Sequence, residues 1–268
     1  DVVIAVMGLD ASLEGEEGDT GNEYGSGDKP NLNLPGLQHD ILKIAKESGK
    51  PVILVLLTGS AMAVTWEDEN LDAIVQGWYP GAQGGTAIAR ILFGEANPEG
   101  KLPVTFYRTT EELPAFEDYS MKGRTYRYMK QKALYPFGFG LSYTDYVYEN
   151  AVVVSDDIRG GKGVVLRADV RNAGAMDGTE TVQIYVGLER EDAPNPQLKK
   201  IVKVSLKAGE TRKVEVVLPR EAFMLCNKYG ERILYPGTYH IYMGGSQPDA
   251  RSRELTKKEV CHFQISLD

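Results

Sequence analysis

The sequence predicts an α/β sandwich domain with a mostly parallel sheet, followed by an all-β sandwich. In the first half, buried strand-like runs alternate with segments of helical spacing, which is typical of crossover units around a parallel sheet. Beyond residue 149 the pattern changes to short alternating strands separated by turn clusters. The length of 268 residues also suits two domains, because a domain usually spans roughly 100–200 residues.

The first domain is expected to span residues 1–148. Its opening apolar run, residues 1–7, has no basic region or start methionine before it, so we interpret it as an interior strand of a longer protein. Residues 107–148 form a long aromatic-rich tail, and a segment of that length either lines a site or clamps one domain on another. The expected strands are residues 2–7, 52–57, 102–106 and part of 71–78, and the expected helices are residues 37–46 and 85–93.

The second domain is expected to span residues 149–268 as a seven-stranded sandwich of the immunoglobulin or fibronectin type. Turn signals between the strands, for example at residues 172–174 and 236–237, have the spacing that such sandwiches show. The expected strands include residues 164–170, 181–186, 201–206, 212–217 and 238–243.

The composition argues against two classes of partner. A net charge of −8 would repel a phosphate backbone, and the basic residues form no run, so we expect no nucleic acid. The longest apolar stretch is far shorter than the ~20 residues of a membrane span, so we expect no membrane segment. The cellular location stays open between secretion, the periplasm and the cytoplasm. Cys226 and Cys261 either form one disulfide or remain free thiols.

A group of carboxylates, including Glu14, Glu16 and Asp19, follows the first strand. Open α/β sheets present their sites in loops past the carboxyl ends of parallel strands. Crowded carboxylates raise one another's pKa, and a general acid must be protonated near neutral pH. Taken alone, such a cluster is more often a solvated loop surface. Its spacing does not match an EF-hand calcium loop, so we expect no metal.

Other residues of catalytic interest lack the required pattern. Residues 81–86 resemble a phosphate-binding turn without the Walker lysine or the GxGxxG spacing, which favours a packing turn and no cofactor. Ser60 has no nucleophile-elbow spacing, and His39, His240 and His262 show no metal or triad arrangement. The rings of Trp66, Trp78, Tyr79 and the later tyrosines are suited to stacking on a sugar, although each alone suits a core or an interface.

Several motifs, read in order, form a more specific pattern. They are GLDASLEGEE (8–17), GDK (27–29), LNLPG (32–36), PVILVL (51–56), GWYPG (77–81), NPEGKLPVTF (97–106), GRTYRY (123–128) and YPFGFGLSY (135–143). This ordered set resembles the C-terminal part of glycoside hydrolase family 3, in particular its bacterial β-xylosidase and β-glucosidase branch. Residues from 164 through 239 likewise resemble the fibronectin type III-like domain that often ends such enzymes.

The resemblance implies half of an active site. In that family an N-terminal (β/α)8 barrel supplies an aspartate nucleophile, and the following domain lends a glutamate acid/base. The substrate would be an oligosaccharide or β-glycoside, and the partner would be the barrel, on the same protein or on another chain. The acid/base position falls first on Glu14 and second on Glu16. Asp28 is a candidate substrate contact, and Lys29 stands where the family often has arginine.

Two functions from different classes follow. The first is the C-terminal part of an exo-acting retaining β-glycosidase that releases xylose or glucose and is inactive without its barrel. The alternative is a non-catalytic carbohydrate-binding or scaffold module in which the acidic loop is only a solvated surface.

Overall fold

The computed structural model describes residues 1–10, 12–15, 29–115 and 117–268. The chain divides into two compact units. Unit 1 contains residues 1–96 and 105–119, and unit 2 contains residues 97–104 and 120–268. A compact unit need not coincide with a domain of common ancestry, so the domain boundary near residue 148 stays a prediction.

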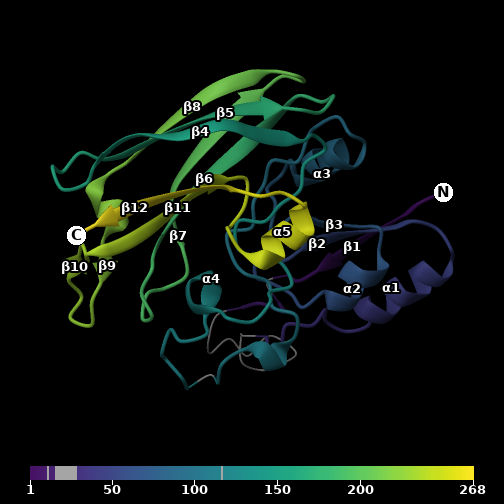
Figure 1. Ribbon diagram of the computed structural model, residues 1–268. Coiled ribbons are helices and arrows are strands. Elements are labelled where there is room, and N and C mark those ends of the chain that lie inside the picture. Colours follow the sequence, from purple (N-terminus) through teal and green to yellow (C-terminus); the bar gives the residue numbers. More distant parts are fainter. Residues whose placement is uncertain (11, 16–28, 116) are drawn as a thin grey trace. The chain divides into compact units, whose positions relative to one another are not determined.

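Unit 1 is built on a parallel sheet with the strand order β1-β2-β3 (Figure 1). This confirms the predicted α/β class. The helices differ from the expected ones by one residue at each end, apart from α2 and the short 3-10 helix η1, which were not predicted. The elements are β1 (Val3–Gly8), α1 (Gln38–Glu47), β2 (Val52–Leu57), α2 (Thr65–Asn70), β3 (Ala73–Gln76), α3 (Gly84–Leu92) and η1 (Thr110–Glu112).

The central strand of this sheet carries the core of unit 1. Val52, Leu54, Val55 and Leu56 of β2 are at most 1% exposed, as expected for a strand that has a neighbour on each side and is covered on both faces.

One apolar side of α1 is exposed rather than buried. Leu37, Ile41 and Ile44, which share one side of this helix, are 70%, 49% and 67% exposed.

The prediction of a strand at residues 102–106 is wrong. Residues 102–105 form no strand, and Phe106 makes only an isolated bridge. The backbone of Leu102 is already engaged, because its N donates to Phe139 O and its O accepts from Gly138 N. Pro103 follows with no N–H to donate, so a sheet ladder cannot continue through it.

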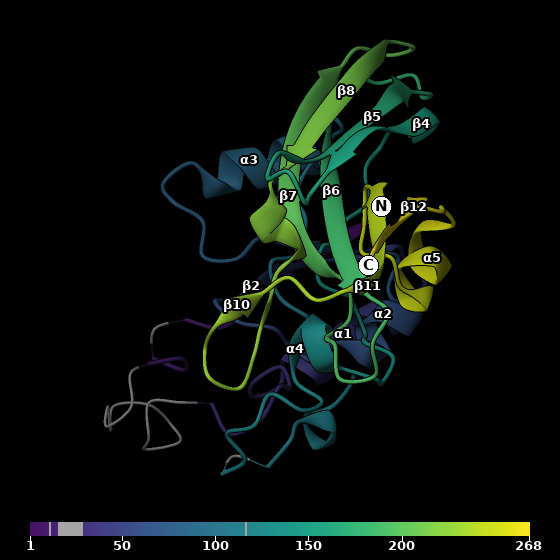
Figure 2. The same cartoon turned by 60° about the vertical axis from the view of Figure 1, so that its left-hand side comes forward.

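Unit 2 contains two antiparallel sheets, in the orders β4-β5-β8 and β12-β11-β6-β7. Figure 2 shows β4, β5 and β8 side by side. The seven strands confirm the predicted all-β sandwich, although the first and the last of them were not among the predicted ranges. They are β4 (Tyr146–Asp157), β5 (Gly163–Asn172), β6 (Gly178–Leu188), β7 (Gln197–Leu206), β8 (Thr211–Leu218), β11 (Gly237–Gly244) and β12 (Cys261–Leu267).

Smaller elements complete unit 2. A two-stranded hairpin is formed by β9 and β10, and short helices lie before the first strand of the sandwich and between its later strands. They are α4 (Thr125–Tyr128), η2 (Arg220–Phe223), β9 (Leu225–Cys226), β10 (Arg232–Ile233) and α5 (Ala250–Thr256).

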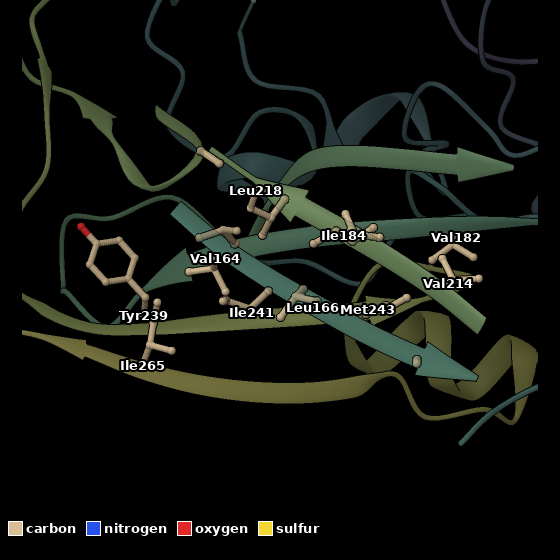
Figure 3. Close-up of a cluster of buried hydrophobic side chains, with 14 of the residues drawn as sticks. Val164, Leu166, Val182, Ile184, Val214, Leu218, Tyr239, Ile241, Met243 and Ile265 are labelled. Atoms are coloured by element: carbon tan, nitrogen blue, oxygen red, sulfur yellow. The ribbon is translucent and has the colours of Figure 1, made fainter. Parts of the chain in front are cut away.

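The core of unit 2 lies between its two sheets (Figure 3). Along β5, Val164, Leu166, Ala168 and Val170 alternate with more exposed residues and are all 0% exposed, which is the period of two that a half-buried strand requires. β6 is buried at most of its positions. Part of the aromatic-rich segment packs on the other face of β6, since Tyr126 meets the ring of Tyr185 edge-on at a centroid distance of 6.3 Å, and Tyr185 alternates with the core residues Ile184 and Val186.

Candidate functional site

The carboxyl ends of the three parallel strands of unit 1 meet at one edge of the sheet. Gly8, the last residue of β1, has φ +144, and a Cβ on it would lie 1.8 Å from the carbonyl oxygen of Leu57. Only glycine permits this close approach of β1 and β2. The side chain of Gln38 on α1 holds the same glycine, because its Oε1 accepts from Gly8 N and its Nε2 donates to Gly8 O, each at 2.8 Å.

The carboxylate of Glu14, in the loop after β1, is bound by residues that follow the other two strands. Ser60 Oγ donates to Glu14 Oε1. Glu14 Oε2 accepts from the backbone N of Gly59 at 3.1 Å and from Tyr79 Oη at 2.7 Å. Lys29 Nζ lies 3.9 Å from Oε1. We call these five residues the Glu14 network, and it attaches the loop after β1 to the loops after β2 and β3.

The network favours the ionised form of Glu14. Burial alone would raise the pKa of this carboxyl, but hydrogen bonds from Ser60 and Tyr79 and the charge of Lys29 outweigh burial, so the pKa lies below its usual value. Burial and the hydrogen bond to Glu14 raise the pKa of Tyr79 to about 12. Tyr79 therefore remains a hydrogen-bond donor at neutral pH.

Lys29 connects Glu14 to the loop after β2. Its Nζ donates to Ser60 Oγ and to the carbonyl oxygen of Ala61, the latter at 3.0 Å. Burial lowers the pKa of this ammonium, and the charge of Glu14 opposes that shift. Ser60 Oγ accepts a hydrogen bond from Lys29 and donates one to Glu14, so its hydroxyl bridges the ammonium and the carboxylate.

Two backbone positions shape the network. A Cβ on Gly59 would lie 2.6 Å from Tyr79 Cε2 and 2.8 Å from Glu14 Oε2, so the site has no room for a larger residue there. Trp78 has φ +55, a left-handed conformation that costs a bulky residue on the order of 1–3 kcal/mol. Its ring packs edge-on against Phe106 at a centroid distance of 6.3 Å. The chain therefore turns sharply just before Tyr79.

The residues singled out from the sequence lie in different places. Glu14 belongs to the network, whereas Glu16 and Asp28 lie outside the described residues. His39 contacts the buried carboxylate of Glu67, with Nδ1 and Oε1 2.7 Å apart. Within the described ranges, no group of three or more histidine, cysteine, aspartate and glutamate side chains is arranged to hold a metal ion.

No pattern in the sequence connects Ser60 and Tyr79 with Glu14. The sequence presents Ser60 as a serine without nucleophile-elbow spacing and Tyr79 as a ring suited to stacking. A usable signal was their position, because Ser60 follows β2 and Tyr79 follows β3 within three residues of the strand ends. Residues so placed converge at the edge of a parallel sheet.

Cys226 and Cys261 are both free thiols in the structure. In the part of the chain that the structure describes, no helix combines the length and the apolar character that crossing a bilayer requires.

Comparisons with known proteins match both units. Residues 1–143 match the glycosyl hydrolase family 3 C-terminal domain. Residues 180–247 match the fibronectin type III-like domain. The sequence is 43% identical over 258 residues to a xylan 1,4-beta-xylosidase of Xylanibacter ruminicola, covering 95% of this chain and 30% of that protein. It is 32% identical over 258 residues to a periplasmic beta-glucosidase of Salmonella typhimurium, covering 91% and 32%.

Solved structures show the same similarity. The chain superposes on a beta-glucosidase from Listeria innocua in complex with glucose with a TM-score of 0.79 and 27% identity, over 99% of this chain and 36% of that one. A mutant of the same enzyme is described in complex with laminaribiose. The chain thus spans about a third of the length of the relatives it matches.

Proposed function

Because the chain belongs to glycosyl hydrolase family 3, we propose that it is the C-terminal part of an exo-acting retaining β-glycosidase that releases terminal xylose or glucose. The relatives above are named as β-xylosidases and β-glucosidases, which supports this substrate class. The observation that carries the proposal is the Glu14 network, which presents an oriented carboxylate at the carboxyl edge of the sheet.

Retaining hydrolysis requires two carboxyl groups roughly 5–5.5 Å apart. One attacks the anomeric carbon, and the other protonates the leaving oxygen and later deprotonates water. In our proposal the nucleophile comes from a (β/α)8 barrel, and this chain supplies the acid/base from the loop after β1. Glu14 and Glu16 are the two candidates, and Asp28 is proposed to contact the substrate or to position the loop.

The lowered pKa of Glu14 matters for this assignment. A carboxylate is suited to act as the base in the second step, but the first step needs a protonated acid. If Glu14 is the acid/base, a nucleophile carboxylate and a bound sugar must raise its pKa, through like-charge repulsion and loss of water. If Glu16 is the acid/base, the role of Glu14 is instead to hold in position the loop that carries Glu16.

The full-length protein can separate these assignments through the variants Glu14→Ala and Glu16→Ala. Loss of the acid/base should slow hydrolysis of substrates with poor leaving groups far more than those with good ones, by about 10²–10⁴-fold. Added azide should restore turnover of the good substrates. If the replaced glutamate only holds the loop in position, its variant should lose activity on both substrate types, and azide should not restore it.

The alternative function is a non-catalytic carbohydrate-binding or scaffold module. The engagement of both Glu14 oxygens within the chain also suits a purely structural carboxylate. If neither alanine variant discriminates between leaving groups and azide rescues neither, the glycosidase assignment of this loop is wrong and the alternative is favoured.

A further inference from the structure

A second candidate site lies entirely in unit 2. A cavity of about 830 Å³ is lined by α4, the loop between β6 and β7, and the β9–β10 hairpin; the hairpin and α4 are labelled in Figure 1. Its walls carry five basic and two acidic side chains, so positive charge predominates there although the whole chain has a net charge of −8.

The acids leave part of this positive charge uncompensated. Arg190 donates to Asp192 Oδ2 at 2.9 Å, and its guanidinium lies 4.3 Å from the centre of the Tyr235 ring. Of the other four basic residues, Lys228 places its Nζ 5.0 Å from the centre of the Tyr229 ring, and the remaining three are Arg127, Lys199 and Arg232. Among the described residues, Arg190–Asp192 is the ion pair between cavity-lining side chains, so these three cations have no acidic partner.

Lys199 is the most informative of the three. Its side chain is partly buried on β7, and its Nζ donates to Gln197 Oε1 at 2.9 Å. Burial lowers the pKa of Lys199, and the charges of Arg127 and Arg232 lower it further. A partly buried ammonium that faces two like charges destabilises the fold. An anion bound among the three would remove that penalty.

The remaining lining suggests what the anion is attached to. Tyr128, Tyr229 and Tyr235 contribute aromatic rings, with Lys228 over one face of Tyr229 and Arg190 over one face of Tyr235. Asn227 and Gln197 contribute amides. Rings and amides are the groups that pack on and hydrogen-bond to sugars. The volume also fits a ligand of several rings, because small-molecule sites span roughly 300–1,000 Å³. A lone inorganic anion would leave most of it unfilled.

We propose that this cavity binds a carboxylate-bearing oligosaccharide, with its uronic acid group among Arg127, Lys199 and Arg232 and its neutral rings along the tyrosines. The site is separate from the Glu14 network and does not depend on the glycosidase assignment. It would give the protein a preference for acidic over neutral glycans.

The test is calorimetric binding to the full-length protein. The probes are a xylo-oligosaccharide that has thioglycosidic links, which glycosidases do not cleave, and carries one glucuronic acid, the same oligosaccharide without the acid, and inorganic phosphate. The acidic oligosaccharide should bind more tightly than the neutral one, and this difference should shrink at high ionic strength. Lys199→Met or Arg232→Met should each weaken its binding by about tenfold or more.

Lys200→Met is the matched control, because Lys200 is the exposed neighbour on β7 and does not line the cavity. It should bind like the unaltered protein. Equal affinity for the acidic and neutral oligosaccharides, or unchanged binding in both cavity variants, would overturn the proposal. Phosphate binding as tightly as the acidic oligosaccharide would overturn the saccharide part. Any binding at the glycosidase site is common to all variants and cancels when the cavity variants are compared with the unaltered protein.

Discussion

Tyr79 and Ser60 each donate a hydrogen bond to Glu14, and they come from different strand ends. With the amide of Gly59 they satisfy both oxygens of the carboxylate. Charge-assisted bonds of this kind are stronger than neutral ones, and they also restrict the orientation of the side chain. At the scale of single residues, the site is therefore a preorganised carboxylate, whichever catalytic role it has.

Tyr79→Phe should weaken the network in a pH-dependent way. Glu14 has a lowered pKa in the folded chain, so its contribution to the free energy of unfolding is present above the unfolded pKa of about 4.3 and is lost as the pH falls through the folded value. Removing the Tyr79 hydroxyl should cost about 1 kcal/mol at pH 7 and less in acid.

Denaturant unfolding at neutral and acidic pH checks this expectation. Tryptophan fluorescence is a suitable probe because Trp66 and Trp78 are the 2 tryptophans of the chain and both lie in unit 1. Tyr119→Phe is the control, since the Tyr119 side chain is 89% exposed. An equal loss of stability at both pH values would contradict the charge-assisted bond.

Gly59→Ala should disrupt the same network by crowding it. The new Cβ would overlap the Tyr79 ring and Glu14 Oε2, and such overpacking costs about 1–3 kcal/mol. Thermal unfolding followed by tryptophan fluorescence measures it. Gly85→Ala on α3 is the matched control, because a Cβ there meets nothing within 4 Å and alanine favours a helix. If both variants unfold alike, the packing around Gly59 is not as described.

At the scale of elements, α1 and β1 are joined by a side chain rather than by apolar packing alone. Gln38 bonds both backbone groups of Gly8 and so secures the strand end from which the Glu14 loop departs. Hydrophobic periodicity predicts the helix. The two hydrogen bonds between Gln38 and Gly8 depend on the Gly8 backbone facing α1, and no local sequence pattern encodes that arrangement.

Gln38→Ala should leave the N–H and C=O of Gly8 without these partners. We expect a loss of about 1–3 kcal/mol in the free energy of unfolding of unit 1. Glu47→Ala, at an exposed position near the end of the same helix, should change it by less than about 0.5 kcal/mol. Denaturant titration of both variants makes the comparison, and equal stabilities would show that the Gln38 contact contributes nothing.

The sandwich depends instead on apolar burial between sheets. Leu166→Ala on β5 removes a side chain that is 0% exposed and should cost about 2–5 kcal/mol. Val217→Ala on β8 is the control, because Val217 is 51% exposed. Far-ultraviolet circular dichroism during thermal unfolding should show a lower midpoint for the first variant alone. Comparable shifts would contradict the assignment of Leu166 to the core.

At the scale of the whole molecule, the chain carries apolar surface that its own fold leaves exposed. Leu37, Ile41 and Ile44 on α1 and Ile4 and Val6 on β1 are between 42% and 70% exposed. Scattered apolar residues are ordinary on a surface, but contiguous apolar patches mark interaction sites. Leu37, Ile41 and Ile44, which share one side of α1 and its N-cap, are the apolar residues of unit 1 that best suit such a contact.

The 268-residue chain alone should not hydrolyse aryl β-xylosides or β-glucosides. The reason is that the proposed mechanism takes its nucleophile from another domain, and one carboxyl group cannot serve as both the nucleophile and the acid/base. A chromogenic assay of this chain beside the full-length protein tests it. Hydrolysis by the chain alone would require both carboxyl groups within it and would refute the division of the active site.

The sequence by itself determined the fold class and the family. Burial periodicity is a local property, so the apolar run of β2 and the alternation along β5 could be predicted from neighbouring residues. The motifs are likewise short runs of neighbouring residues, and their order along the chain identified the family. The prediction of a strand at residues 102–106 was wrong because the backbone of Leu102 makes its hydrogen bonds with residues 138–139 instead of with a neighbouring strand.

Only the tertiary structure decided what surrounds Glu14 and what lines the cavity of unit 2. Ser60 and Tyr79 lie 46 and 65 positions from Glu14 in the chain, and parallel strand ends bring them to it. Arg127, Lys199 and Arg232 likewise come from three separate elements. Hydrogen bonds and charge repulsion act through space over a few ångströms, whereas sequence patterns report only on residues close together along the chain.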